Sequence, residues 1–180
     1  MSVFEGHTHL VHKIIELHNG NLASCSLDRT INIWDRHTGE IINTLEGFES
    51  DIKDIQEVDS NNLAILNFDD NTFMIWNYKK ELEDNCLTYE EHEDAINKII
   101  VVNHKYIFSG SSDCTVKKWS IKSNRRSEAT YHGHSGPITD VIFLDNKQFA
   151  SASGDKTIKI WEVSTKFNAY TLEGHSRPVT

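Results

Sequence analysis

Residues 133–161 read GHSGPITDVIFLDNKQFASASGDKTIKIW, and this stretch decides the fold of the chain. Apolar-rich runs of strand length occupy residues 138–144, 149–153 and 157–161, with short polar turns between them. A fourth short run, residues 169–172, follows a polar loop. Short strands joined by polar hairpin turns, without helical periodicity, predict one four-stranded antiparallel sheet.

The same stretch recurs along the chain. Its closing tryptophan has counterparts at intervals of 42, 43 and 42 residues, namely Trp34, Trp76, Trp119 and Trp161. A period of this size is typical of repeat architectures in which each copy is one supersecondary unit. Sheets that are apolar on both faces are unstable alone, so the copies are expected to stack.

The copies also share a polar pattern, in which Gly-His is followed by Ser-x-x-x-Asp-x-x-x-x-x-Trp. This pattern closely resembles that of the WD-repeat β-propeller family, and the resemblance covers essentially the whole chain. Copy three has Glu91 where the pattern has glycine, and copy two is degenerate, with Phe48 and Leu66 at the histidine and serine positions. The complete sets are His7, Ser24, Asp28 and Trp34; His92, Ser109, Asp113 and Trp119; and His134, Ser151, Asp155 and Trp161.

The resemblance implies an all-β fold, a β-propeller built of four-stranded antiparallel blades. We expect one WD-repeat domain over residues 1–180, with four repeats and the start of a fifth. The expected blades are residues 6–46, 47–90, 91–132 and 133–173, and residues 174–180 open the fifth copy. Propellers have about four to eight blades, so we expect an open ring that missing repeats or a second copy would close.

In the family, the histidine, serine, aspartate and tryptophan of one copy form a buried hydrogen-bonded set that holds the sheet together. A buried imidazole needs partners on both ring nitrogens, and these residues can supply them. In copy two, the histidine and serine are replaced together. Removing both partners of a hydrogen bond can be nearly neutral, whereas removing one strands a buried polar group.

Two other kinds of site compete for these residues. Serine, histidine and aspartate together suggest a hydrolase, but the same set occurs three times, and the chain has no Gly-x-Ser-x-Gly elbow and no phosphate-loop glycine pattern. His7, His9 and His12 suggest a metal cluster, but His7 belongs to a repeat set. We therefore expect no catalytic residue, no metal and no cofactor.

The family usually binds peptides or protein domains on the narrow face of the propeller. Its contact positions lie beside the first apolar residue of each inner strand and just before the tight-turn aspartate. Carried onto this chain, the candidate protein-binding residues are Leu10, His12, Leu27, Asp51, Lys53, Asp69, Ala95, Asn97, Ser112, Pro137, Thr139 and Gly154.

Composition limits the partners and the compartment. A formal net charge of -9 disfavours broad binding to nucleic acid or to an anionic membrane. We interpret the basic cluster as a solvated blade rim, because it contains no interleaved aromatic; its members are Lys117, Lys118, Lys122, Arg125 and Arg126. We interpret the acidic residues 81–94 as a loop. The start of the chain does not resemble a signal peptide. Three widely spaced cysteines predict free thiols and a cytoplasmic location, with the nucleus as the alternative.

The function that these observations favour is a non-enzymatic scaffold for a protein or peptide partner. One alternative is a substrate receptor of a ubiquitin ligase, although the repeats begin at residue 6, leaving no room for an F-box, and no tryptophan is followed by arginine at the third position. Another alternative is the targeting module of a larger enzyme whose catalytic domain lies beyond Thr180.

Overall fold

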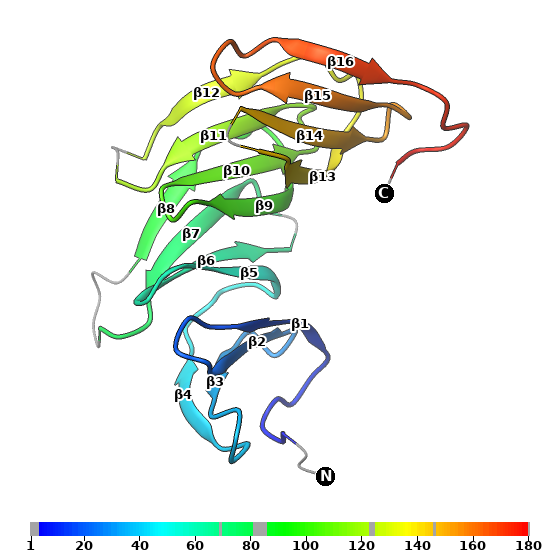
Figure 1. Cartoon of the computed structure of the whole chain (residues 1–180). Helices are drawn as coiled ribbons and strands as arrows, with labels where there is room; N and C mark the ends of the chain where they lie inside the picture. Colours follow the sequence, from blue (N-terminus) through cyan, green and yellow to red (C-terminus); the bar gives the residue numbers. More distant parts are fainter. Residues whose placement is uncertain (1–3, 69, 81–85, 123–124, 146, 180) are drawn as a thin grey trace. The chain divides into compact units, whose positions relative to one another are not determined.

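The computed structural model describes residues 4–179 except 69, 81–85, 123–124 and 146. These residues contain sixteen strands and no helix, arranged as four sheets of four strands (Figure 1). Neighbours along the chain are neighbours in each sheet. The all-β blade organisation expected from the repeat is confirmed. Since no helix occurs in the described ranges, none there is long and apolar enough to cross a membrane.

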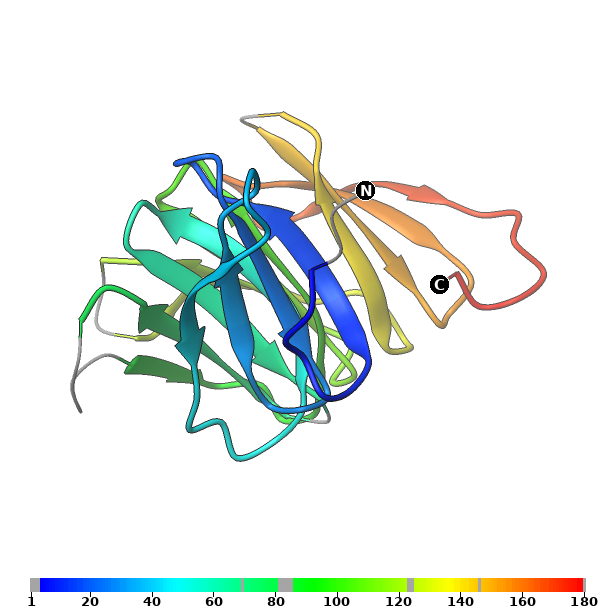
Figure 2. The same ribbon diagram turned by 90° about the horizontal axis from the view of Figure 1, so that it is seen from below.

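The strands follow the repeat closely, and each sheet is visibly twisted (Figure 2). The first sheet has β1 (Val11–Glu16), β2 (Leu22–Ser26), β3 (Ile31–Trp34) and β4 (Ile41–Leu45); the second has β5 (Ile52–Asp59), β6 (Asn62–Asn67), β7 (Thr72–Asn77) and β8 (Cys86–Glu90). The third has β9 (Ile96–Val102), β10 (Tyr106–Ser111), β11 (Val116–Ser120) and β12 (Ser127–Tyr131); the fourth has β13 (Ile138–Phe143), β14 (Gln148–Ser153), β15 (Ile158–Glu162) and β16 (Asn168–Leu172).

One expectation about these strands is wrong. Residues 86–90, inside the acidic stretch predicted as a loop, form β8. Leu87 and Tyr89 alternate there with polar residues, and Tyr89 is buried. Edge strands tolerate charged side chains, so acidity did not prevent pairing with β7.

The chain forms two compact units, residues 1–68 with 73–88, and residues 69–72 with 89–180. The first unit has a core between the first and second sheets, to which Ile33, Ile55 and Leu63 contribute. Phe48 and Tyr78 complete this core at its ends. The stacking expected of sheets with two apolar faces is therefore present inside this unit.

The second unit has its own core, between the third and fourth sheets. Phe108, Tyr131, Phe149 and Trp161 pack there with ring centroids 4.8–6.3 Å apart. Gly110 permits the close approach of β10 to β13, because a Cβ on it would lie 2.5 Å from a side-chain methyl of Ile138. A glycine at this strand position is explained by close sheet packing.

The second sheet departs from the register that the sequence suggested. Ser24, Ser109 and Ser151 each pair with the residue two before their tryptophan, whereas Ile65 pairs with Met74, two before Trp76. Ile65 therefore takes the serine's place, and the expectation that Leu66 does so is wrong by one residue. The cause is one extra residue in the second sheet, because six residues separate the paired Leu66 and Phe73, whereas five separate the equivalent pair Cys25 and Ile31 in the first sheet.

The segment that opens a fifth copy, residues 174–179, lies against the fourth sheet. The hydroxyl of Thr139 donates to the carbonyl of Val179 (2.6 Å), just as the amide of Asn97 donates to the carbonyl of Ile138 (2.9 Å). Val179 thus sits beside the fourth sheet as Ile138 sits beside the third.

Candidate functional site: buried polar sets and a candidate protein-binding surface

The structure brings the four residues of each complete polar set together inside its sheet. In the first sheet, the ring of His7 bridges Ser24 Oγ (2.7 Å from Nε2) and Asp28 Oδ2 (2.9 Å from Nδ1). The indole N–H of Trp34 donates to the same serine oxygen at 2.7 Å. Because a carboxylate only accepts, Nδ1 carries the proton and Nε2 accepts from the serine hydroxyl.

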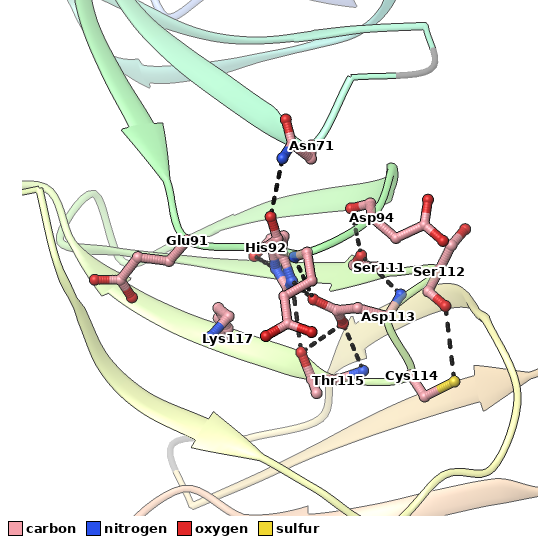
Figure 3. A network of polar contacts seen from close by, with 12 residues as sticks. Asn71, Glu91, His92, Asp94, Ser111, Ser112, Asp113, Cys114, Thr115 and Lys117 are labelled. Carbon is pink, nitrogen blue, oxygen red and sulfur yellow. Dashed lines mark hydrogen bonds and ion pairs between the residues drawn. The ribbon is translucent and has the colours of Figure 1, made fainter.

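The third and fourth sheets repeat this geometry. His92 lies 2.7 Å from Ser109 Oγ and 2.6 Å from Asp113 Oδ2, with Trp119 donating to Ser109 at 2.7 Å (Figure 3 shows His92 and Asp113). His134 lies 2.9 Å from Ser151 Oγ and 2.7 Å from Asp155 Oδ2, and Trp161 donates to Ser151 at 2.8 Å.

Each aspartate is held by more than its histidine. The hydroxyl of the threonine two residues later (Thr30, Thr115 or Thr157) donates to its Oδ1 at 2.7 Å. The backbone N–H after the histidine donates to Oδ2 at 2.9–3.1 Å. The aspartate therefore joins the tight turn to the segment that enters the blade.

The hydrogen bonds of these sets shift the pKa values. Burial alone would raise the pKa of Asp28, but the bonds from Thr30, Thr8 N–H and His7 outweigh it and lower the pKa from 3.8 to about 2. The pKa values of Asp113 and Asp155 are lowered in the same way, against burial. Burial lowers the pKa of His134 below 6.5, although Asp155 partly offsets this.

The sets resemble a hydrolase triad in geometry but not in accessibility. Ser24, Ser109 and Ser151 are each at most 3% exposed. A nucleophile needs a free oxygen lone pair at an open cleft. Here the indole N–H occupies one lone pair of that oxygen and the serine hydroxyl bonds to the histidine, so each serine links two other members of its buried set.

The second sheet lacks this set. Phe48 packs against Trp76 with ring centroids 5.0 Å apart and the ring planes tilted by 49°, and Ile65 is fully buried. Asp70 retains the contacts that the aspartates of the other sheets make within the turn. Its Oδ1 accepts hydrogen bonds from the Thr72 N–H (3.0 Å) and hydroxyl (2.9 Å).

Glu91, at the glycine position of copy three, takes a role of its own. Its carboxylate accepts the N–H (3.1 Å) and the hydroxyl of Ser127 at the start of β12. In Figure 3 its side chain points away from His92. The departure from glycine thus supports the outer strand and leaves the polar set intact.

The candidate surface residues lie in pairs at one end of each sheet. A backbone hydrogen bond joins the residue before the first strand to the residue before the turn aspartate in three sheets. The bonds run from Leu27 to Leu10 (3.0 Å), from Ser112 to Ala95 (2.8 Å) and from Gly154 to Pro137 (2.8 Å). All six residues are at least partly exposed.

In the second sheet, the corresponding bond runs from Phe68 N–H to Asp51 O (2.9 Å). The candidate Asp69 lies outside the described residues. The sequence analysis missed Phe68 because it aligned the second copy with the others without allowing for the extra residue between β6 and β7. Residues 63–66 are all apolar and buried, so no alternation in the sequence marks the shift.

The remaining candidates differ between the units. In the first unit, the ring of His12 lies 4.9 Å from that of Phe68, and Lys53 Nζ lies 5.9 Å from the same ring. In the second unit, the Asn97 amide donates to Ser112 Oγ at 2.9 Å and to Ile138 O. The first unit therefore presents aromatic and cationic groups, and the second presents neutral polar groups.

The histidines considered as metal ligands do not form a cluster. His7 belongs to the buried set, His9 is exposed and His12 contacts Phe68. No group of three or more metal-ligating side chains occurs in the part of the chain that the structure describes. Within that part, Cys25, Cys86 and Cys114 form no disulfide bond, and burial raises the pKa of Cys25 to about 12.

The profile of the family described as "WD domain, G-beta repeat" matches residues 1–35, 84–120 and 125–162. The chain belongs to the WD40 repeat family. The matched ranges contain the three complete polar sets, and the degenerate second copy lies largely outside them. WD repeats generally mediate protein–protein interactions and are generally not enzymes.

The proteins similar to this chain include one that is named for WD repeats. The chain is 27% identical over 109 residues to mouse "WD repeat-containing protein 37", a match covering 61% of this chain and 22% of that protein. It is 28% identical over 117 residues to "Eukaryotic translation initiation factor 3 subunit I" of Schizosaccharomyces pombe, covering 61% and 36%. It is 24% identical over 110 residues to "Autophagy-related protein 16" of Arabidopsis thaliana, covering 60% and 21%. The chain therefore spans a fifth to a third of these relatives.

Proposed function

We propose that this chain is a non-enzymatic scaffold that binds a protein or peptide partner on the narrow face of a WD-repeat propeller. The observation that carries this proposal is the paired arrangement of the candidate residues. In three sheets a backbone hydrogen bond of 2.8–3.0 Å joins two candidate residues at the strand ends, and in the second sheet such a bond joins the candidate Asp51 to Phe68. Binding residues on loops positioned by a rigid scaffold are a common way to build a recognition surface.

The buried polar sets support the non-enzymatic part of the proposal. Their serines, histidines and aspartates bond with one another and with the tryptophan or threonine of the same repeat. They stabilise the loops that carry the candidate residues, since each aspartate also holds the backbone N–H after the histidine.

Two finer assignments remain within this proposal. The chain can be the targeting module of a larger enzyme or a ubiquitin-ligase substrate receptor, with the other parts outside the 180 residues. The relatives, which are three to five times longer than the matched stretch, favour a larger whole. Cytoplasmic location is proposed only because the cysteines of the described residues form no disulfide bond.

We also propose that further repeats, or a second copy, cover the outer face of the first sheet. Val11 and Ile14 there are 48% and 58% exposed, whereas Ile138 and Val141, at the same repeat positions in the fourth sheet, are 0% and 1% exposed under the third sheet. An apolar face of this kind is a site for packing or for aggregation.

A pull-down with the intact protein tests the binding face. Leu27→Lys, Asn97→Lys and Thr139→Lys together should abolish capture of the partner, because they place three charges at the strand ends. A matched control with Asn19→Lys, Thr38→Lys and Thr165→Lys changes exposed residues in turns at the opposite strand ends and should retain capture. Retained capture by the first variant would move the site away from the narrow face.

A further inference from the structure

A cavity of about 620 Å³ lies at the outer edge of the third and fourth sheets, within the second unit. Lys118, Glu128, Lys147, Glu162, Val163 and Lys166 line it. It is at the strand ends where β13 turns into β14 and β15 turns into β16. Since β14 turns into β15 at the other end, this cavity is separate from the candidate protein-binding surface.

In the first unit, side chains fill the equivalent position at the edge of the first and second sheets. The residue before the tryptophan of β3 is Ile33, which is 3% exposed and packs in the same core as Tyr78. Tyr78 is the second residue after Trp76, and its N–H donates to Asn61 O (3.0 Å). Asn43, which pairs with Ile33, donates its side-chain amide to Tyr78 O (3.4 Å). An isoleucine, an asparagine and a tyrosine thus seal the edge of the first pair of sheets.

The second unit carries smaller or charged residues at these same positions. Lys118 stands where Ile33 does, and Ala129, which pairs with Lys118, stands where Asn43 does. Val163 replaces Tyr78, and its N–H donates to Lys147 O (2.8 Å). Two side chains are shortened and one becomes a cation, so the edge is open and positively charged where the first unit is sealed.

Lys118 is held in a partly desolvated position. Its side chain is 15% exposed, and its Nζ lies 3.0 Å from Glu128 Oε2 and 3.8 Å from the centre of the Tyr106 ring. An ammonium group has three N–H donors, and one carboxylate does not use them all. An anion in the cavity can accept a further donor, and a cation removed from water is stabilised by such a partner.

The charges of the lining favour an anionic occupant. Three lysines and two glutamates give the cavity a formal charge of +1 in a chain of net charge -9. Lys147 and Lys166 are exposed, and Lys166 Nζ donates to the backbone carbonyl of Glu128 at 3.4 Å. A volume of this size accommodates a small ligand or a few residues of an extended peptide rather than a folded element.

We propose that this cavity binds an anionic side chain of a partner protein, through a carboxylate or a phosphoryl oxygen. Lys147 and Lys166 attract the group from solvent, and Lys118 contacts it inside the cavity. The site is additional to the narrow face, so a partner can engage the chain at both ends of its strands.

The test measures binding of short labelled peptides to the intact protein by fluorescence anisotropy, at low and high salt. The peptides are rich in glutamate, in phosphoserine or, as the neutral control, in glutamine. The glutamate or phosphoserine peptide should bind, more weakly at high salt, and the glutamine peptide should not. Lys147→Glu with Lys166→Glu should weaken binding about tenfold or more, as expected for reversing two partly screened ion pairs.

Two further variants keep the outcome unambiguous. Lys122→Glu with Arg126→Glu changes the net charge equally at exposed positions outside the cavity and should leave binding unchanged. Lys118→Ile restores the residue type of Ile33, and it should remove binding without lowering the melting temperature.

Three results would overturn the proposal. These are equal weakening by both charge-reversal pairs, equal binding of the glutamine peptide, and no binding of either acidic peptide. Inorganic phosphate that binds as tightly as the phosphoserine peptide would indicate a free-anion site and would reject the protein partner.

Discussion

The second and fourth sheets differ in how the segment that enters each sheet is held against its strands. The fourth sheet ties its entering segment to its strands through His134, Ser151 and Asp155, with Trp161 donating to the serine. The second sheet has Phe48 packed against Trp76, and it has Ile65 where the serine would be. Both arrangements give a four-stranded sheet with the same strand order.

The difference shows that the polar set behaves as a unit. A buried histidine without its serine, or a buried serine without its histidine, would leave a polar group unsatisfied. The second sheet contains neither member; Trp76 remains, packed against Phe48, and Asp70 remains, bonded to Thr72 at the turn. The set is therefore exchangeable for apolar packing when its buried members change together.

The largest expected effect is on the tryptophans. Trp161→Ala should lower the free energy of unfolding by roughly 3–5 kcal/mol, because the indole is 1% exposed and also donates a hydrogen bond. Trp76→Ala should cost less, since that side chain is only partly buried. Urea denaturation of both variants measures the contrast. An equal or larger loss at Trp76 would contradict the comparison.

A smaller effect is expected from exchanging the polar set itself. His134→Phe alone should destabilise by about 1–3 kcal/mol, because Ser151 and Asp155 lose a buried partner. Adding Ser151→Ile reproduces the second sheet, and much of the loss should be recovered. The double-mutant cycle from urea denaturation gives the coupling.

The matched control replaces Ser151 by leucine instead of isoleucine. Isoleucine is the native residue at the equivalent position of the second sheet, because Ile65 there pairs with Met74. If the double variant is no more stable than the sum of its single changes implies, the two members of the set are not exchanged as a unit.

The smallest effect is the dependence of stability on pH. The pKa of His134 is lowered from 6.5 in the folded state, mainly by burial. Below pH 6.5 the unfolded chain therefore binds more protons than the folded chain. The contribution of His134 to the free energy of unfolding is complete above pH 6.5 and is lost as the pH falls below this value. The pKa of Asp28 is lowered to about 2, so its contribution is present above pH 3.8 and is lost between 3.8 and about 2.

Thermal melts across this range should therefore show stability falling in two stages on acidification. The variant His134→Phe with Ser151→Ile should flatten the stage just below pH 6.5, because it carries a phenylalanine as the second sheet does. An unchanged slope there would show that His134 does not contribute.

Much of the fold was predictable because the informative spacings are local. A tryptophan, a serine and an aspartate within one hairpin predict where two strands and their turn lie, and the strand order follows from short connections. The histidine contacts both residues from 17 and 21 positions away, and the family pattern supplied that pairing. The candidate loop pairs could be located in three sheets for the same reason.

The misplaced positions have a common cause. One extra residue in the turn after Asn67 changes which of two buried neighbours, Ile65 or Leu66, faces the tryptophan side. Both are fully buried, so hydrophobicity could not distinguish them. Because of the same shift, the sequence analysis did not identify Phe68 as a surface position. The strand β8 was missed because its segment is acidic, although an edge strand tolerates charge on its outer face.

The sequence by itself determined the repeat, its four sheets and the members of each polar set, because each of these depends on spacings within one copy. Only the tertiary structure decided what each copy meets in its neighbour. Lys118 belongs to an ordinary basic cluster in the sequence, and packing of the fourth sheet against the third places it in a charged cavity beside Val163. Contacts between copies depend on the shapes of both surfaces, and no period within a single copy encodes them.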